Sequence, residues 1–166
     1  MLIVDDQVAN VLLLERLLTN AGYLDITSTQ NPSTVMELHR SNKYDLILLD
    51  LNMPEMDGFQ VIEGLKEIEN GGVPPVLVIT AQPDEKMRAL NAGALDFVSK
   101  PFDIAEVLAR VKNLLQVRLL HLETQKLYEQ VLIEQDLSEM LLHNVLPQAI
   151  ADRLKGRSKF TADHLN

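Results

Sequence analysis

Five short apolar runs recur along the first hundred residues. They are MLIV (1–4), LDITST (24–29), YDLILLD (44–50), PVLVIT (75–80) and LDFVS (95–99). Each is too short for a helix and rich in leucine or β-branched residues, which predicts strands. The third and fourth runs are continuously apolar rather than alternating. That pattern is typical of strands covered on both faces, as in a parallel sheet.

Amphipathic segments fill the intervals between these runs. QVANVLLLERLLTNAG has apolar residues at helical spacing and ends on Gly22, while NPSTVMELHRSN begins with Asn31 as an N-cap and Pro32 at the first helical position. DGFQVIEGLKEIENGG and PDEKMRALNAG are also amphipathic and end on glycine. Strands and helices therefore alternate, which predicts a doubly wound α/β domain with a five-stranded parallel sheet and right-handed crossovers.

The last helical pattern continues far beyond the fifth strand. Residues 102–146 contain no glycine and no proline, and these 45 residues would span roughly 65 Å as a helix. A helix longer than ~25 residues favours a coiled coil. Positions spaced alternately three and four residues apart form one stripe along such a helix, which we call the 3-4 stripe. Its apolar residues support the coiled coil: Leu120, Leu127, Val131, Leu141 and Val145. The stripe also contains polar residues that can fix register, Thr124, Glu134 and Ser138.

We therefore predict that the last helix extends into a parallel two-stranded coiled coil that makes the chain a homodimer. The alternative is one long helix folded back on its own domain. Pro147 is expected to break or bend the helix, with a further short helix around Ile150 and Leu154 before Gly156 and a frayed tail. The predicted parts are a domain at 1–117, a coiled-coil helix at 118–146 and a terminal element at 147–166.

Composition narrows the class of protein. Hydrophobic residues make up 46% of the chain and charged residues 23%, as in soluble globular proteins. The absence of cysteine excludes disulfides and thiolate metal sites, and no apolar stretch is long enough for membrane insertion, so a cytoplasmic location is expected. The net charge of −9 argues against a general nucleic-acid surface. Residues 1–102 hold 15 acidic and 7 basic residues, which favours a cation there.

Polar residues stand where the predicted strands end. Asp5 and Asp6 follow the first strand, Asp50 closes the third, Thr80 closes the fourth and Lys100 lies just past the fifth. Because sites in doubly wound sheets form at the carboxyl ends of strands, these groups are expected to converge. Three close carboxylates need a counter-charge, which Mg²⁺ can supply. A carboxylate beside Mg²⁺ and a lysine is suited to attack a phosphoryl group and form an aspartyl phosphate.

The same segments resemble a known family. LIVDD, LILLDLNMPEMDG, VLVITA and DFVSKPF are similar to the response-regulator receiver domains of two-component signalling, over roughly residues 1–117. The resemblance implies a flavodoxin-like sheet and a phosphoryl group received from a sensor histidine kinase or phosphotransfer protein. It implies these roles: Asp50 as phosphoacceptor; Asp5, Asp6 (more directly) and the backbone carbonyl of Asn52 as Mg²⁺ ligands; Thr80 as switch hydroxyl; Phe97 as switch aromatic; and Lys100, before a normally cis Pro101, aimed into the site.

Each of these residues also has a plainer interpretation. A lone aspartate at a strand end is usually a cap or turn former, Thr80 can be an ordinary strand residue and Phe97 a core residue. Five matched positions in order favour the functional interpretation for the aspartates. The histidines lie without ligand spacing, so no metal or catalytic role is predicted for His39, His121, His143 and His164.

A second, shorter resemblance concerns the end of the chain. LLHNVLPQAIADRLK is similar to the helical element before the catalytic domain of class III adenylate and guanylate cyclases, on Asn144, Leu146, Pro147, Ile150, Ala151, Leu154 and Lys155. This implies a cyclase output domain beyond the chain. The resulting hypothesis is that phosphorylation of Asp50 moves Thr80 and Phe97, changes the pose of two receivers and is transmitted through the dimeric helix.

Three alternatives remain. The receiver can control another output, such as a PP2C-like serine phosphatase. The chain can be an Asp-nucleophile phosphatase of the haloacid-dehalogenase type, but that class has a second aspartate where this sequence has Asn52. It can also be a scaffold that has lost phosphorylation, which the complete set of signature residues disfavours. The chain itself is predicted to be a regulatory module and not an enzyme.

Overall fold

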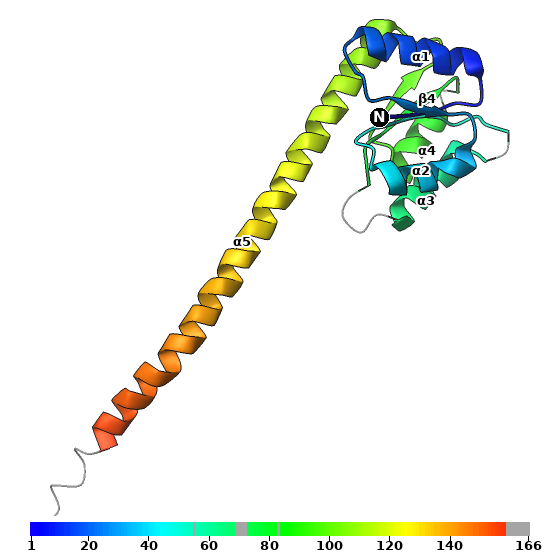
Figure 1. The fold of residues 1–166 in the computed structure, drawn as a ribbon. Coiled ribbons are helices and arrows are strands. Elements are labelled where there is room, and N and C mark those ends of the chain that lie inside the picture. Colours follow the sequence, from blue (N-terminus) through cyan, green and yellow to red (C-terminus); the bar gives the residue numbers. More distant parts are fainter. Residues whose placement is uncertain (55, 69–72, 83, 159–166) are drawn as a thin grey trace, which may run out of the picture. The chain divides into compact units, whose positions relative to one another are not determined.

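The computed structural model describes residues 1–54, 56–68, 73–82 and 84–158, with side chains as far as Leu141. The chain forms two compact units, Met1–Leu120 and His121–Asn166, and each is described separately. The first unit holds a five-stranded parallel sheet with the strand order β2-β1-β3-β4-β5 (Figure 1). Its strands are β1 (Leu2–Val4), β2 (Thr27–Thr29), β3 (Ile47–Asp50), β4 (Val76–Thr80) and β5 (Asp96–Ser99). The predicted doubly wound, flavodoxin-like sheet is confirmed.

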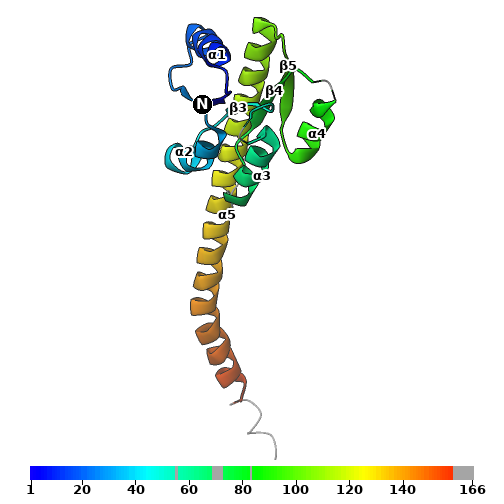
Figure 2. The same ribbon diagram turned by 90° about the vertical axis from the view of Figure 1, so that its right-hand side faces the viewer.

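Helices cover both faces of this sheet (Figures 1 and 2). One face packs against α1 (Val8–Asn20) and the beginning of α5 (Ile104–Ser158). The other packs against η1 (Pro32–Thr34), α2 (Val35–Asn42), α3 (Gly58–Ile68) and α4 (Glu85–Ala92).

The core explains the continuous apolar runs in the sequence. Successive residues of a strand point to opposite faces. In β3, Leu48 therefore joins the cluster under α1 and α5, whereas Leu49 joins the cluster under α2, α3 and α4. Leu77 and Val78 of β4 divide in the same way. A central strand with helices on both faces needs apolar residues along its length, and both strands have them up to their last residues, Asp50 and Thr80.

The helix ends follow the predicted chemistry where the structure describes them. Asn31 caps η1, since its Oδ1 accepts a hydrogen bond of 2.9 Å from the Ser33 backbone N–H. Gly22 and Gly93 adopt φ values of 93° and 112° just after α1 and α4, a conformation that glycine reaches without steric cost. The glycines expected to end α3, at 71 and 72, lie outside the described residues.

All five strands begin later than the predicted runs, β1, β4 and β5 by one residue and β2 and β3 by three. The run at 24–29 yields only Thr27–Thr29, because β2 is an edge strand that pairs with the three residues of β1 alone. The run at 44–50 yields Ile47–Asp50. Tyr44 and Leu46 are buried before the strand begins, so their apolar character reflects the core and not strand pairing.

In the second unit, all described residues, from His121 to Ser158, belong to α5. The expected break at Pro147 and the separate helix around Ile150 and Leu154 are wrong, because one helix runs through these positions. A proline removes a single backbone donor, and the neighbouring hydrogen bonds can continue the helix on either side. The expected frayed tail over 159–166 lies outside the described residues. No helix in the described ranges is both long and apolar enough to cross a membrane.

Candidate functional site

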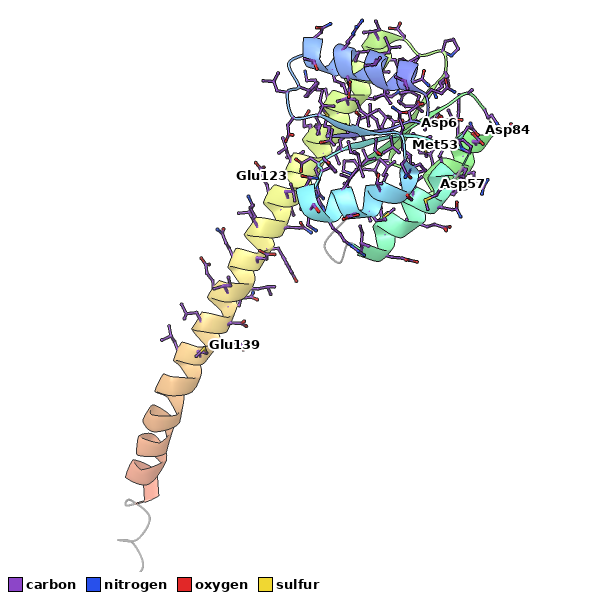
Figure 3. The ribbon with its side chains drawn as sticks, turned by 45° about the vertical axis from the view of Figure 1, so that its right-hand side comes forward. Asp6, Met53, Asp57, Asp84, Glu123 and Glu139 are labelled. Carbon is purple, nitrogen blue, oxygen red and sulfur yellow. The ribbon has the colours of Figure 1, made fainter. Side chains whose placement is uncertain are left out.

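The residues predicted for the site lie at the carboxyl ends of the strands. Asp5 and Asp50 are buried, with 2% and 3% of their surface exposed, and Thr80 is fully buried. Asp6 is half-buried, and Figure 3 shows it at this edge of the sheet with Met53, from the loop after β3. The sheet therefore brings together acidic groups that are up to 45 residues apart in sequence, as the doubly wound topology predicts.

Lys100 joins two of the carboxylates. Its Nζ lies 3.1 Å from Asp5 Oδ2 and 3.1 Å from Asp50 Oδ2. The Lys100–Pro101 peptide bond is cis, as the family resemblance implied. The backbone N–H of Lys100 donates to the Thr80 carbonyl at 2.8 Å, which ties the end of β5 to the end of β4. One cation thus serves as the counter-charge for two buried acids.

Asp5 and Asp6 differ in their hydrogen bonding. Asp5 accepts bonds from the Gln7 backbone N–H at 2.8 Å and from Asn10 Nδ2 at 3.1 and 2.9 Å, in addition to Lys100. Asp6 Oδ1 is buried and has no hydrogen-bond partner in the described part of the chain. A buried carboxylate oxygen without a partner is costly unless a cation or water meets it.

The three aspartates can hold a metal ion. Ligand oxygens of Asp5, Asp6 and Asp50 lie within 4.8 Å of one another. Hard divalent cations prefer such an oxygen donor set, and the unpaired Asp6 Oδ1 is suited to direct coordination. A hollow of about 320 Å³ borders Asp6 between Gln30–Pro32 and Met53–Pro54, so the cluster can be reached from solvent.

Burial raises the pKa of the Asp50 carboxyl above its ordinary value. Lys100 lowers this pKa through its charge and its hydrogen bond, the Asp5 carboxylate raises it, and the Asn52 backbone N–H, 3.4 Å from Asp50 Oδ1, lowers it slightly. The opposing contributions do not cancel the cost of burying the charge. Without a metal, the native state therefore holds the Asp50 proton more tightly than an unfolded chain does.

Asp50→Asn is consequently expected to stabilise the metal-free fold at neutral pH. Because the folded-state pKa is raised, ionisation of Asp50 costs stability as the pH rises through that pKa. The amide removes this cost, which should increase the free energy of unfolding by about 1 kcal/mol and raise Tm by a few degrees. The gain should disappear below the ordinary carboxyl pKa of about 4, where both states are protonated. Thermal unfolding in a chelator across pH measures it.

Asp84→Asn is the matched control for this experiment. Asp84 is exposed and makes no side-chain cap on α4, so its substitution removes the same charge without relieving a buried one. A lower Tm for Asp50→Asn at neutral pH, or a gain that persists undiminished in acid, would contradict the stated cause of the pKa shift.

The loop after β3 packs closely beneath Asp50. A Cβ on Gly58 would lie 2.7 Å from the Asp50 carbonyl oxygen, so only glycine permits this approach. Asp57 and Gln60 cap α3 reciprocally: Gln60 N–H donates to Asp57 Oδ1 at 2.9 Å, and Asp57 N–H donates to Gln60 Oε1 at 3.1 Å. This is a capping box, and the sequence signal for it is the spacing of Asp57 and Gln60 in DGFQ. Met53 is buried, as a packing residue of the loop.

The Thr80 hydroxyl does not bond to Asp50 in this structure. It donates to Glu85 Oε2 at 2.6 Å and accepts from the Gln82 backbone N–H at 3.1 Å. Asn52 Nδ2 donates to the same Glu85 oxygen at 3.2 Å. Sequence reasoning missed Glu85 and the side chain of Asn52. The available signal was an acidic residue in the first turn of the helix that follows Thr80.

Phe97 is half-buried on β5, between two cations. Lys86 Nζ lies 4.9 Å from the ring centroid and the Arg110 guanidinium 5.7 Å. Arg110 is held by Asp96 at 2.6 Å and Glu106 at 2.8 Å. Phe97 therefore packs partly against the core while its ring also contacts charged side chains of α4 and α5, so the core interpretation describes it only in part.

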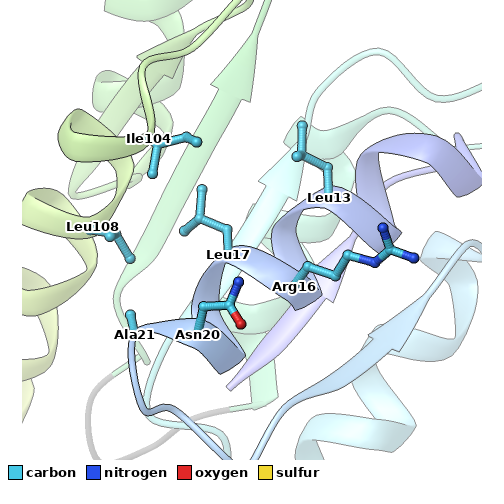
Figure 4. A pocket seen from close by; sticks show the side chains of 7 residues that line it. All are labelled: Leu13, Arg16, Leu17, Asn20, Ala21, Ile104 and Leu108. Atoms are coloured by element: carbon cyan, nitrogen blue, oxygen red, sulfur yellow. The ribbon is translucent and has the colours of Figure 1, made fainter.

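A second hollow lies apart from these residues, between α1 and the start of α5 (Figure 4). It measures about 290 Å³ and is lined mainly by apolar side chains, with Arg16 and Asn20 supplying polar atoms. Figure 4 shows Leu13 and Leu17 of α1 opposite Ile104 and Leu108 of α5. None of its lining residues belongs to the acidic cluster.

The fold and the acidic edge define a domain equipped to accept a phosphoryl group with the help of a cation. Residues 1–112 match the family model of the response regulator receiver domain, and the chain belongs to this family. Members are regulatory modules, not catalytic enzymes, and are phosphorylated on an aspartate by histidine kinases or phosphotransfer proteins.

Curated relatives agree with this assignment. The response regulator PleD of Caulobacter vibrioides is 39% identical over 120 residues, which cover 71% of this chain and 26% of PleD. The transcriptional regulatory protein PrrA of Mycobacterium tuberculosis is 37% identical over 119 residues, covering 70% of this chain and 50% of PrrA. The chain thus spans about a quarter to a half of the length of these relatives.

Solved structures show the same domain. A putative response regulator from Chloroflexus aurantiacus has a TM-score of 0.65 and 31% identity over 69% of this chain and 95% of that one. The signal receiver domain of a signal transduction histidine kinase from Syntrophus aciditrophicus has a TM-score of 0.62 and 32% identity, over 69% and 88% of the two chains.

Proposed function

We propose that Asp50 is the phosphoacceptor of this receiver domain. The observation that supports this most is its position at the tip of β3, buried, 3.1 Å from Lys100 and beside two further carboxylates. An Asp50 carboxylate oxygen forms the new bond to phosphorus as the bond from phosphorus to the donor's imidazole nitrogen or leaving oxygen breaks. Lys100 can then move from pairing with the carboxylate to pairing with a phosphoryl oxygen, without crossing the site.

The cation is proposed to be Mg²⁺. Asp5, Asp6, Asp50 and the backbone carbonyl of Asn52 would hold it, with Asp6 in direct contact because its Oδ1 lacks another partner. Bound Mg²⁺ would neutralise negative charge on the transferring phosphoryl group. Thr80 and Phe97 are proposed to respond to phosphorylation, Thr80 by donating its hydroxyl hydrogen to a phosphoryl oxygen and Phe97 by changing its partly buried position beside α4 and α5.

The helix of the second unit is proposed to form a parallel coiled coil with a second copy of the chain. Residues on the 3-4 stripe are solvent-exposed although apolar: Leu127 is 62% exposed, Val131 49% and Leu141 58%. Ile133, Leu137 and Met140 are also exposed, but they follow a separate spacing that lies roughly 80–140° around the helix from the stripe. A helix that exposes apolar groups at the spacing of the 3-4 stripe along one face gains by burying them against an identical helix.

Glu134→Leu is expected to strengthen this dimer. Glu134 is an exposed polar residue on the stripe, and a leucine there would add two buried apolar side chains per dimer. Self-association should tighten by roughly tenfold or more. Glu129→Leu is the matched control because it changes the same residue type on the opposite side of the helix. Sedimentation equilibrium of the two variants measures the difference, and equal association of both, or none, would contradict the coiled coil.

The output of the whole protein is proposed to be a class III adenylate or guanylate cyclase. Support comes from the segment LLHNVLPQAIADRLK, whose side chains after Leu141 lie outside those the structure describes. Receiver similarity does not select the output, since the relatives include PrrA, a transcriptional regulatory protein, and PleD, named only as a response regulator. Formation of a cyclic nucleotide and pyrophosphate by the full-length protein tests this; phosphoserine hydrolysis instead would favour the PP2C-like alternative.

A further inference from the structure

The first turn of α4 is connected to the site through Glu85. Its carboxylate accepts a 2.6 Å hydrogen bond from the Thr80 hydroxyl, and the same oxygen accepts from Asn52 Nδ2 at 3.2 Å. Thr80 ends β4, Asn52 belongs to the loop after β3, and Glu85 is the first residue of α4. One half-buried carboxylate oxygen therefore ties three separate segments together at the acidic edge.

A threonine hydroxyl has a single hydrogen to donate. A bond of 2.6 Å to a carboxylate is short and charge-assisted, which places it among the stronger side-chain hydrogen bonds. The hydroxyl oxygen meanwhile accepts from the Gln82 backbone N–H at 3.1 Å. Thr80 cannot donate to a phosphoryl oxygen while it donates to Glu85.

From this competition we propose that Glu85 is a positioning residue that holds the Thr80 hydroxyl in the unphosphorylated arrangement and must release it when Asp50 is phosphorylated. The inference rests on the proposed role of Asp50. Release gives up a charge-assisted bond and leaves the Glu85 carboxylate near a phosphoryl group of the same sign. Both effects oppose the phosphorylated state, so Glu85 sets how readily the domain switches.

The residue after Glu85 connects the same turn of α4 to Phe97. Lys86 follows Glu85 directly, and its Nζ lies 4.9 Å from the centre of the Phe97 ring. The first turn of α4 thus contacts Thr80 through one side chain and Phe97 through the next. When Glu85 releases Thr80, the end of α4 that contacts Phe97 loses this hydrogen bond to β4. This gives a contiguous physical connection between the hydroxyl and the aromatic ring.

Beryllofluoride, added with Mg²⁺ to the whole chain, is the probe for this inference because it mimics an acyl phosphate on an aspartate. Glu85→Gln keeps the size of the side chain but weakens the bond to Thr80 and removes the repulsion. The variant should bind beryllofluoride roughly 3- to 10-fold more tightly than the wild type, as NMR titration of the Gln82 amide can measure. Asp84→Asn removes the same charge one residue earlier, on an exposed side chain without a cap bond, and should leave the affinity unchanged.

A double-mutant cycle separates positioning from a general charge effect. In a Thr80→Ala background, Glu85→Gln should increase the affinity by clearly less than in the wild type, because the bond it weakens is already missing and only the repulsion is relieved. Unchanged or weaker binding by Glu85→Gln, or an equal gain in both backgrounds, would overturn the inference. Circular dichroism shows whether each variant is folded. If Glu85→Gln is not folded, Glu85→Ala repeats the test. If the wild type itself fails to bind beryllofluoride, the proposed role of Asp50 fails instead.

Discussion

Asp50→Asn is expected to abolish phosphoryl incorporation from acetyl phosphate and Mg²⁺, with a loss of at least about a thousandfold in rate. The amide has no ionised oxygen to attack phosphorus. Its shape is otherwise retained. Asp5 does not replace it as acceptor, because the Asp5 carboxylate is already bonded to Gln7, Asn10 and Lys100. The intact mass of the protein after incubation with the donor measures the incorporated phosphoryl group.

The interpretation of this loss depends on a folded variant. The same substitution should raise Tm in a chelator, because it removes a buried carboxyl whose pKa is raised by burial. Loss of phosphorylation together with greater stability cannot be attributed to unfolding. Undiminished incorporation into Asp50→Asn would show that the acceptor is another residue, whereas Asp84→Asn should be phosphorylated like the wild type.

Lys100→Met is expected to reduce the rate of phosphorylation by roughly 100- to 1000-fold. Lys100 is the cation 3.1 Å from both Asp5 and Asp50, so it is positioned to neutralise charge that develops on the phosphoryl oxygens. Methionine keeps most of the apolar stem but leaves two buried carboxylates without their shared counter-charge. The metal-free variant should therefore also be less stable, and added Mg²⁺ should restore part of the lost stability.

Lys100→Arg is the control, because it keeps the positive charge but changes the geometry of the charged group. The guanidinium is planar and larger, so it should protect the stability of the metal-free fold better than methionine while recovering little of the rate. Phosphorylation kinetics by intact mass and thermal unfolding with and without Mg²⁺ separate the two effects. A Lys100→Met variant phosphorylated at the rate of the wild type would contradict the role assigned to the lysine.

The sequence was sufficient to predict the sheet because β3 and β4 are apolar at every position before their last residue. Leu48 and Leu49 enter opposite clusters, and only a sheet covered on both faces demands that pattern. The extent of β2 could not be predicted, since Leu24 and Ile26 look strand-like but strand pairing is set by the three residues of β1. The continuation of α5 through Pro147 could not be predicted either. Proline lacks one backbone N–H donor, and whether the helix continues depends on the helical turns before and after it.

The positions of the site residues were also predictable, because the carboxyl ends of parallel strands meet at one edge. The partners of those residues were not. Glu85 reaches Thr80 from a helix, and Arg110 reaches Phe97 from α5, and such contacts depend on packing between elements and not on any local spacing. The contact of Asn10 with Asp5 has a sequence signal, because Asn10 stands in the first turn of the helix that follows the aspartate pair.

The most direct test of the phosphoacceptor role is chemical mapping of the phosphoryl group. Wild-type protein is incubated with acetyl phosphate with and without Mg²⁺, reduced with borohydride, which converts an acyl phosphate of aspartate to homoserine, and digested for mass spectrometry. Homoserine at position 50, formed only when Mg²⁺ is present, is the predicted result. Homoserine at Asp5, Asp6 or another carboxylate, with position 50 unmodified, would contradict the account.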